Sequence, residues 1–375
     1  MAQMGIMYAS LYPPVHGRSL GKRKRRQRRM PRWVLLDKLA YFSDADVRNA
    51  TTATSKTREG HEIQVTLCTA ARPPLVSYVC IHSPTLNPKT DDFAMEPQII
   101  AAHDDLLLIR LILGIGNRFT VSLADYFVYQ AASIDDDIPP SLTRITHPGP
   151  MITFTNHEVT ILHNIPEAQD IDEPLISNKQ HYIITTLSPA ATPRNIPLPP
   201  PLKQGKVISG ADPKDVRDIA VDLQGHINFV ELEVDALRHK TDRTGYISQD
   251  WTVAKWSCCI NSESDDCLWH MDYKLNASDI SHLMPPQLPN YCHPTKPSPT
   301  LERLHVGHPL LSLDNNGMAK VDHRDYKAWV IPVDMRKRLI HEPAVFEGAP
   351  RTLGISHTYI QTTISNYLQP VPGHR

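Results

Sequence analysis

One stretch of the sequence decides the fold class: Leu310-Leu311-Ser312-Leu313-Asp314-Asn315-Asn316-Gly317-Met318-Ala319-Lys320-Val321. Apolar segments flank an Asn-Gly pair, and these two residue types tolerate the positive φ angles that tight hairpin turns require. The stretch therefore predicts a β-hairpin with strands at 310–313 and 318–321. A second hairpin is predicted where a short polar segment joins 218–221 to 227–232.

Further segments of alternating or continuous apolar character predict strands on both sides of these hairpins. They lie at 33–36, 63–67, 76–81, 98–101, 106–113, 126–129, 182–187, 253–258, 268–273 and 328–333. Proline makes up 33 of 375 residues, about 9% against a usual ~5%, and proline pairs separate many of these segments. Because proline cannot donate a ladder hydrogen bond, each pair marks a loop or a sheet edge.

The end of the chain carries the best helical pattern. Tyr359, Thr363 and Tyr367 recur at four-residue spacing, which predicts a closing helix over 359–368. Many short antiparallel strands at such intervals are typical of a propeller or a sandwich. The predicted fold is mainly β and propeller-like, with an incomplete propeller as an alternative, and it ends in a C-terminal helix.

The N-terminus is strongly basic. Residues 1–32 hold nine Lys or Arg and no acidic residue, so the other residues carry 30 of the 39 basic and all 40 acidic side chains. The arm is therefore +9 and the body −10, an asymmetry typical of an interaction tail. Its densest part is Lys22, Arg23, Lys24, Arg25, Arg26, Arg28 and Arg29. These residues are predicted to bind a nuclear import receptor or a polyanion, with nucleic acid as a weaker alternative because no aromatic residues interleave with the charges.

Localisation follows from the arm and from the cysteines. Six cysteines without paired spacing predict a reduced compartment rather than a secreted disulfide framework. No apolar run approaches the roughly 18 residues of a membrane span, so no membrane partner is predicted. The prediction is nuclear or cytoplasmic, with plastid or mitochondrion as the alternative, because an acid-free Arg-rich N-terminus also resembles a transit peptide.

Few local motifs suggest chemistry. Cys258, Cys259, Cys267 and His270 are the only local zinc-capable group, but the adjacent cysteines face opposite sides of a strand, so buried thiols are predicted instead of a metal. His270-Met271-Asp272 and Asp135-Asp136-Asp137 lack catalytic or calcium-loop spacing. Nucleophile elbows, phosphate loops and dinucleotide fingerprints are absent. We predict no catalytic residue, no metal and no cofactor.

Four tryptophans leave two interpretations open. Trp251, Trp256, Trp269 and Trp329 could form a binding face, since tryptophan is enriched at interface hot spots. Packing between sheets is the alternative that their apolar neighbours favour.

Ordered blocks of sequence resemble a known family. They are 33–37, 49–52, 76–82, 126–129, 181–184, 196–201, 217–220, 227–232, 251–257, 359–362 and 364–368. Together they resemble the plant "domain of unknown function 1618" family, which is expanded in grasses. This resemblance implies a propeller-type fold and no established catalytic activity. Between 187 and 195 the chain joins two blocks that family members separate by further strands, so the resemblance predicts a truncated or alternatively spliced member.

These observations predict four segments and one leading function. The segments are a disordered basic arm at 1–32, N-terminal β blades at 33–187, a proline-rich junction at 188–216, and a C-terminal β region with the closing helix at 217–370. The leading hypothesis is a non-enzymatic module that binds an unknown protein partner through its loops. The alternatives are a nucleic-acid-associated nuclear protein and a hydrolase-like enzyme whose dispersed His and Asp converge in space.

Overall fold

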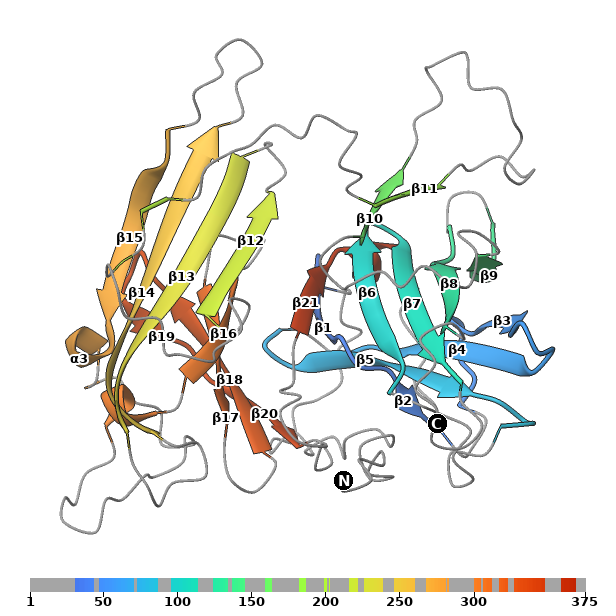
Figure 1. Cartoon of the computed structure of the whole chain (residues 1–375), viewed down its shortest axis with the longest axis horizontal. Coiled ribbons are helices and arrows are strands. Elements are labelled where there is room, and N and C mark those ends of the chain that lie inside the picture. The colour runs from blue at the N-terminus through green and yellow to red at the C-terminus, as the bar shows by residue number, and fades with distance from the viewer. Residues whose placement is uncertain are drawn as a thin grey trace, which may run out of the picture. The chain divides into compact units, whose positions relative to one another are not determined.

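The computed structural model describes most strands of the chain and divides them into two compact units (Figure 1). It describes residues 31–43, 47–70, 73–86, 96–113, 124–133, 137–145, 159–163, 182–186, 199–200, 202, 216–221, 226–238, 246–259, 268–280, 282, 300–304, 306–311, 317–322, 327–347 and 359–368. The first unit contains β1 to β11 and β21, and the second contains β12 to β20. The closing segment 359–368 is thus grouped with the first unit, whereas the predicted division kept it with the C-terminal β region.

The first unit is built on a six-stranded sheet in the order β21-β1-β5-β4-β3, with β2 also paired to β5. Its strands are β1 (Val34–Asp37), β2 (Tyr41–Phe42), β3 (Ala53–Lys56), β4 (Glu62–Cys68), β5 (Val76–His82) and β21 (Tyr359–Thr362). Both β1 and β2 pair with β5 in parallel. The predicted antiparallel pairing therefore holds for β1 with β21, β3 with β4 and β4 with β5, but not for these two parallel contacts.

Two smaller antiparallel sheets complete the first unit. One is a meander of β6 (Gln98–His103), β7 (Leu106–Ile112), β8 (Ala124–Gln130) and β9 (Ser141–Ile145), and the other pairs β10 (Val159–His163) with β11 (Tyr182–Thr186). The main core joins the six-stranded sheet to the meander, with Phe42, Leu107 and Phe127 among its buried members. Ile364 and Leu368 complete it from the C-terminal segment.

The predicted C-terminal helix was wrong. Residues 359–362 form β21, which pairs with β1, and a 3-10 helix of four residues follows at Ile364–Tyr367. Each residue of β21 pairs with a residue of β1, so the strand gains ladder hydrogen bonds. A short helix would instead have to form its first turn, which is unfavourable. The described residues include the short α-helix α3 (Ala277–Ile280), and no described helix is long and apolar enough to cross a bilayer.

The second unit contains two antiparallel sheets (Figure 1). The first has the order β12-β13-β14-β15, with bounds Arg217–Val221, His226–Arg238, Tyr246–Cys259 and His270–Asn276. The second contains β16 (Val306–Leu311), β17 (Gly317–Asp322), β18 (Lys327–Asp334), β19 (Leu339–Ile340) and β20 (Ala344–Glu347). Both predicted hairpins are confirmed, since Leu311 pairs with Gly317 and Val221 pairs with Ile227. β13 and β14 run for 13 and 14 residues, longer than the short strands predicted.

The core of the second unit lies between its two sheets. Trp251 and Leu232 from one sheet meet Trp329 and Ile331 from the other, and all four are buried. Period-two alternation explains the packing, because Val230, Leu232 and Val234 of β13 and Trp251 and Val253 of β14 all lie at this core. The mainly β class is therefore confirmed.

Candidate functional site

Residues 1–30 of the basic arm lie outside the described residues. Its seven predicted contacts, Lys22 to Arg29 without Gln27, have no described position, so their role stays a prediction.

Of the predicted cysteine and histidine group, Cys267 and the Cys259 side chain lie outside the described residues. Among the described residues, no three His, Cys, Asp or Glu side chains could jointly hold a metal ion. Cys258 is buried and disulfide-bonded, so the prediction of an ordinary thiol was wrong for Cys258. Spacing could not show this, because disulfide formation depends on which cysteines meet in space. His270 is exposed and its Nδ1 lies 3.1 Å from Asp272 Oδ1.

Three of the four tryptophans are core residues. Trp251, Trp256 and Trp329 are buried, and packing between the sheets is confirmed for Trp251 and Trp329, whereas Trp256 packs with Phe229 and Ala254 in a separate cluster. Trp251 Nε1 donates to the Leu301 carbonyl oxygen at 2.9 Å. Trp269 is only partly buried and lies 6.0 Å from the Phe229 ring between centroids.

An apolar row crosses the other face of the sheet β12–β15. Register pairs Ile219 with Phe229, Phe229 with Trp256, and Trp256 with Met271, so one residue from each strand lies on one line. Directly paired residues in a sheet share a face, and this face is opposite the main core of the unit. We call these four residues the outer row. Figure 1 shows the four strands that carry it side by side.

The outer row is covered in the middle and open at its ends. Phe229 and Trp256 are buried, whereas Ile219 is 56% exposed and Met271 is 44% exposed. Leu202 and Trp269 pack against the two central rings. Ile219 and Met271 lie on β12 and β15, the outermost strands of the sheet, and no described strand pairs with their outer edges. The face therefore ends in exposed apolar side chains at both strand edges.

The proline-rich junction contributes to this face. Leu202 donates its N–H to Glu231 Oε2 at 3.0 Å, while Arg217 holds Glu231 Oε1 through two N–H groups at 3.0 and 2.7 Å. Glu231 is buried, so both of its oxygens have donors within the protein. The chain's own segment thus covers the centre of the outer row and leaves its ends accessible.

A polar network lies where β14 pairs with β15, on the face of the sheet opposite the outer row. Asp272 lies at a bulge in β15 and accepts from Ser257 Oγ at 2.8 Å. Its other oxygen lies 3.5 Å from the buried Lys255 ammonium group. A charged pair on the inner face of an edge strand stabilises the register of that strand, because a one-residue slip would separate it.

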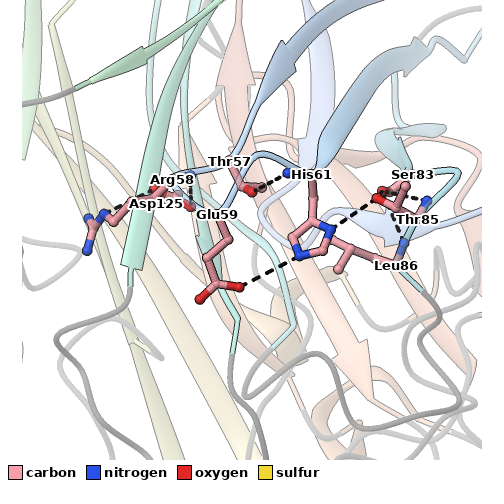
Figure 2. Close-up of polar contacts among 8 residues, drawn as sticks. All are labelled: Thr57, Arg58, Glu59, His61, Ser83, Thr85, Leu86 and Asp125. Atoms are coloured by element: carbon pink, nitrogen blue, oxygen red, sulfur yellow. Dashed lines mark hydrogen bonds and ion pairs between the residues drawn. The ribbon is translucent and has the colours of Figure 1, made fainter.

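A second polar cluster surrounds the turn that joins β3 to β4 (Figure 2). Gly60 has φ +89°, which completes the tight turn from Thr57 to His61, and Thr57 Oγ1 accepts the His61 N–H at 3.1 Å. His61 Nδ1 lies 3.1 Å from Thr85 Oγ1, and His61 Nε2 lies 3.7 Å from Glu59 Oε2. Glu59, His61 and Thr85 thus follow one another as an acid, a base and a hydroxyl, the order of a catalytic relay.

Two geometric features argue against catalysis at this cluster. The distance between Glu59 and His61 exceeds hydrogen-bond range, so the carboxylate does not orient the imidazole. The N–H groups of Thr85 and Leu86, which could stabilise an oxyanion, face Ser83 Oγ at 3.4 and 3.3 Å. The three side chains therefore tie the turn to the loop after β5.

The same turn covers a buried carboxylate (Figure 2). Asp125 in β8 accepts the Arg58 N–H at 3.1 Å on Oδ2, and its buried Oδ1 accepts no hydrogen bond from the described residues. The Arg58 and Arg144 guanidinium groups lie 3.9 and 3.8 Å from Oδ1. Burial raises the pKa of Asp125, and the Arg58 N–H and the two guanidinium charges offset only part of this effect.

Asp125→Asn is expected to flatten the pH dependence of stability. The pKa of Asp125 in the folded protein lies above its ordinary value of 3.8. The protonated carboxyl therefore stabilises the fold fully below pH 3.8, and this contribution is lost as the pH rises through the folded pKa. Asparagine does not titrate and removes this contribution. The measurement is the free energy of urea unfolding of the full chain between about pH 4 and pH 7. Parallel curves for the two proteins would contradict the prediction.

Comparison with known proteins adds one family. Residues 182–319 match the family model described as "Protein of unknown function (DUF1618)". This part of the chain is similar to the DUF1618 family. No curated protein and no solved structure matches the chain. The resemblance in the sequence is thereby confirmed for these residues, whereas the similar blocks at 33–129 and 359–368 lie outside the match.

The DUF1618 match separates the two candidate regions. It contains all four residues of the outer row together with Leu202 and Glu231, and it excludes the turn at 57–61 and Asp125. Sequence reasoning singled out Trp256 but missed Ile219, Phe229 and Met271. The alternation in β12, β13 and β15 places each on a face, but only the register places them on one line.

Proposed function

We propose that the chain is a non-enzymatic interaction protein whose binding surface is the outer row at the β15 edge of its DUF1618 region. The observation that carries this proposal is the exposure of Met271 and Ile219 at the two ends of an in-register apolar row. The unpaired backbone N–H and C=O groups of an edge strand are a template for pairing with another chain, and exposed apolar side chains favour that association. Proteins that bind by strand addition use the same combination.

The partner that fits this edge is an extended peptide segment. A strand added to β15 would take ladder hydrogen bonds from its outer edge and present alternate side chains to the outer face. Met271 and Lys274 lie on that face of β15, because Met271 pairs with Trp256 and Lys274 pairs with Ala254. Both are exposed, so the segment should carry an apolar residue beside Met271 and an acidic residue beside Lys274.

Selection from a random peptide library with the immobilised full chain tests this proposal. The enriched peptides should alternate and should combine apolar and acidic residues. Met271→Ser should weaken their binding about tenfold, the loss of roughly 1.4 kcal/mol expected when one apolar contact is removed. Methylation of alternate peptide amides should abolish binding, since strand addition needs those N–H groups.

Leu339→Ser is the matched control. Leu339 is 41% exposed, close to the 44% of Met271, and lies on β19 in the other sheet of the same unit. Its replacement should leave peptide affinity unchanged. Equal affinities of the Met271→Ser variant and the unaltered chain would contradict the proposal, as would enrichment of helical or purely basic peptides.

The basic arm gives the proposal its second part. We infer that Lys22 to Arg29 direct the protein to the nucleus through an import receptor, with plastid or mitochondrion as the alternative destination. A run of seven positive charges among eight residues supports this inference. Nucleic-acid binding through the same residues would require a steep loss of affinity with added salt.

The propeller-like arrangement also belongs to this proposal. Consecutive strands pair in the order β6-β7-β8-β9 and again β12-β13-β14-β15, and such four-stranded meanders are the repeating unit of propellers. Pairing of the last strand β21 with the first strand β1 also supports a closed chain path.

A further inference from the structure

Two cysteines of the first unit meet across neighbouring strands. Cys68 ends β4 and pairs with Tyr78, whereas Cys80 lies two residues further along β5 and pairs with Thr66. The two cysteines are therefore diagonal neighbours on one face of the sheet. Their sulfur atoms lie 3.8 Å apart, and both thiols are free.

The two thiols differ in exposure. Cys68 is partly exposed at the end of its strand, while Cys80 is 4% exposed on a central strand that also pairs with β2. A small oxidant in solvent therefore reaches Cys68 first. Cys80 lies behind it at a distance suited to a second reaction step.

The surroundings also favour the thiolate of Cys68. Hydrogen bonding by Cys80 and by Tyr78 lowers the pKa of Cys68 and outweighs the opposing effect of burial. Hydrogen bonding to Cys68 and burial raise the pKa of Cys80, so that this thiol keeps its proton. Tyr78 is held in place by an edge-to-face contact with Tyr41, whose ring centroid lies 5.5 Å away. The thiolate is the reactive form of cysteine toward peroxide.

We propose that Cys68 and Cys80 form a reversible redox site that takes a hydroperoxide as its oxidant. The Cys68 thiolate attacks one peroxide oxygen, the O–O bond breaks, and hydroxide leaves to give water after protonation. Cys68 is then a sulfenic acid. The Cys80 sulfur attacks the Cys68 sulfur, the S–O bond breaks, and the departing hydroxide takes up the Cys80 proton as water. Two thiols and one hydrogen peroxide thus become one disulfide and two waters.

The bond requires a local change in the sheet. A disulfide is about 2.05 Å long, so the sulfur atoms must approach by about 1.8 Å from their 3.8 Å separation. Leu67, next to Cys68, exchanges hydrogen bonds with Thr51, which also receives the Tyr129 hydroxyl on its carbonyl oxygen. The disulfide therefore alters a strand end that is tied directly to the core of the first unit.

The test treats the full chain with hydrogen peroxide and maps its cysteines by mass spectrometry without reduction. Chymotrypsin is suited to the digestion because it cuts after Leu75 and Tyr78, between the two cysteines. The expected product is one pair of peptides that contains Cys68 and Cys80, has lost two hydrogens, and separates with dithiothreitol. Oxidation of Cys68 to a sulfinic acid without a link to Cys80 would overturn the proposal.

Three variants separate the roles of the residues. Cys80→Ser should leave a sulfenic acid on Cys68 that dimedone traps, and Cys68→Ser should leave Cys80 unmodified at the same peroxide exposure. Tyr78→Phe should slow the reaction about threefold or more at neutral pH, because the thiolate loses a hydrogen-bond donor. Circular dichroism checks that each variant folds. Detection of the linked peptides in the unaltered chain does not depend on the folding of any variant. Equal oxidation of Cys80 with and without Cys68 would also overturn the proposal.

Discussion

Trp251→Ala is expected to lower the free energy of unfolding of the second unit by about 3 to 5 kcal/mol. The side chain is 3% exposed and packs in the core between the two sheets. Its removal leaves a cavity and also deprives the Leu301 carbonyl oxygen of the indole N–H that it accepts at 2.9 Å. Trp251→Phe keeps most of the ring volume and should cost about half as much.

Urea unfolding of the full chain measures this effect, and amide hydrogen exchange assigns it to a unit. Peptides from β12 to β18 should exchange faster in Trp251→Ala, while peptides from β1 to β8 keep their rates. Ile219→Ala is the control on the same sheet, because Ile219 is 56% exposed and its replacement should change stability by less than about 0.5 kcal/mol. A Trp251→Ala protein within about 1 kcal/mol of the unaltered chain would contradict the prediction.

Asp37→Ala is expected to lower the stability of the first unit by about 3 kcal/mol. Asp37 is fully buried at the end of β1. Its Oδ1 accepts the Leu39 N–H at 3.0 Å and its Oδ2 accepts the Tyr41 hydroxyl at 2.5 Å. Alanine leaves both buried donors without their carboxylate, and an unpaired buried donor costs about 1 to 3 kcal/mol. Tyr41→Phe removes one donor and should cost about 1.5 kcal/mol.

The same unfolding and exchange measurements apply, now with faster exchange expected in β1, β2 and β5. Glu59→Ala is the matched control, since Glu59 is an exposed carboxylate of the same unit whose ion pair with His61 is solvent-screened. Equal stabilities of Asp37→Ala and Glu59→Ala would show that the buried carboxylate contributes no more than an exposed one.

The proposals for the redox site and for the outer row can be tested independently. Cys68 and Cys80 lie in the first unit and outside the DUF1618 match, whereas Met271 lies in the second unit and inside it. Loss of peptide binding in Met271→Ser therefore leaves the thiol reaction intact. Failure of disulfide formation would equally leave the peptide-binding proposal standing.

Local sequence signals were sufficient for single elements. The Asn316-Gly317 pair predicted one hairpin, and the strands β16 and β17 on either side of it pair with each other. The pattern at 359–368 shows the limit of such signals. Its spacing suits a helix, but residues 359–362 form a strand because they pair with β1. β1 lies more than 300 residues earlier in the chain. Local periodicity does not include a partner that distant.

The sequence by itself determined that the chain forms β-strands, where most of them lie, that its charge is divided between arm and body, and which family residues 182–319 resemble. These properties depend on residues close together in the chain. Only the tertiary structure showed which residues meet in the outer row and around Asp125, and that Cys68 lies beside Cys80. Each depends on the register between strands, and a shift of one residue would turn every side chain to the opposite face.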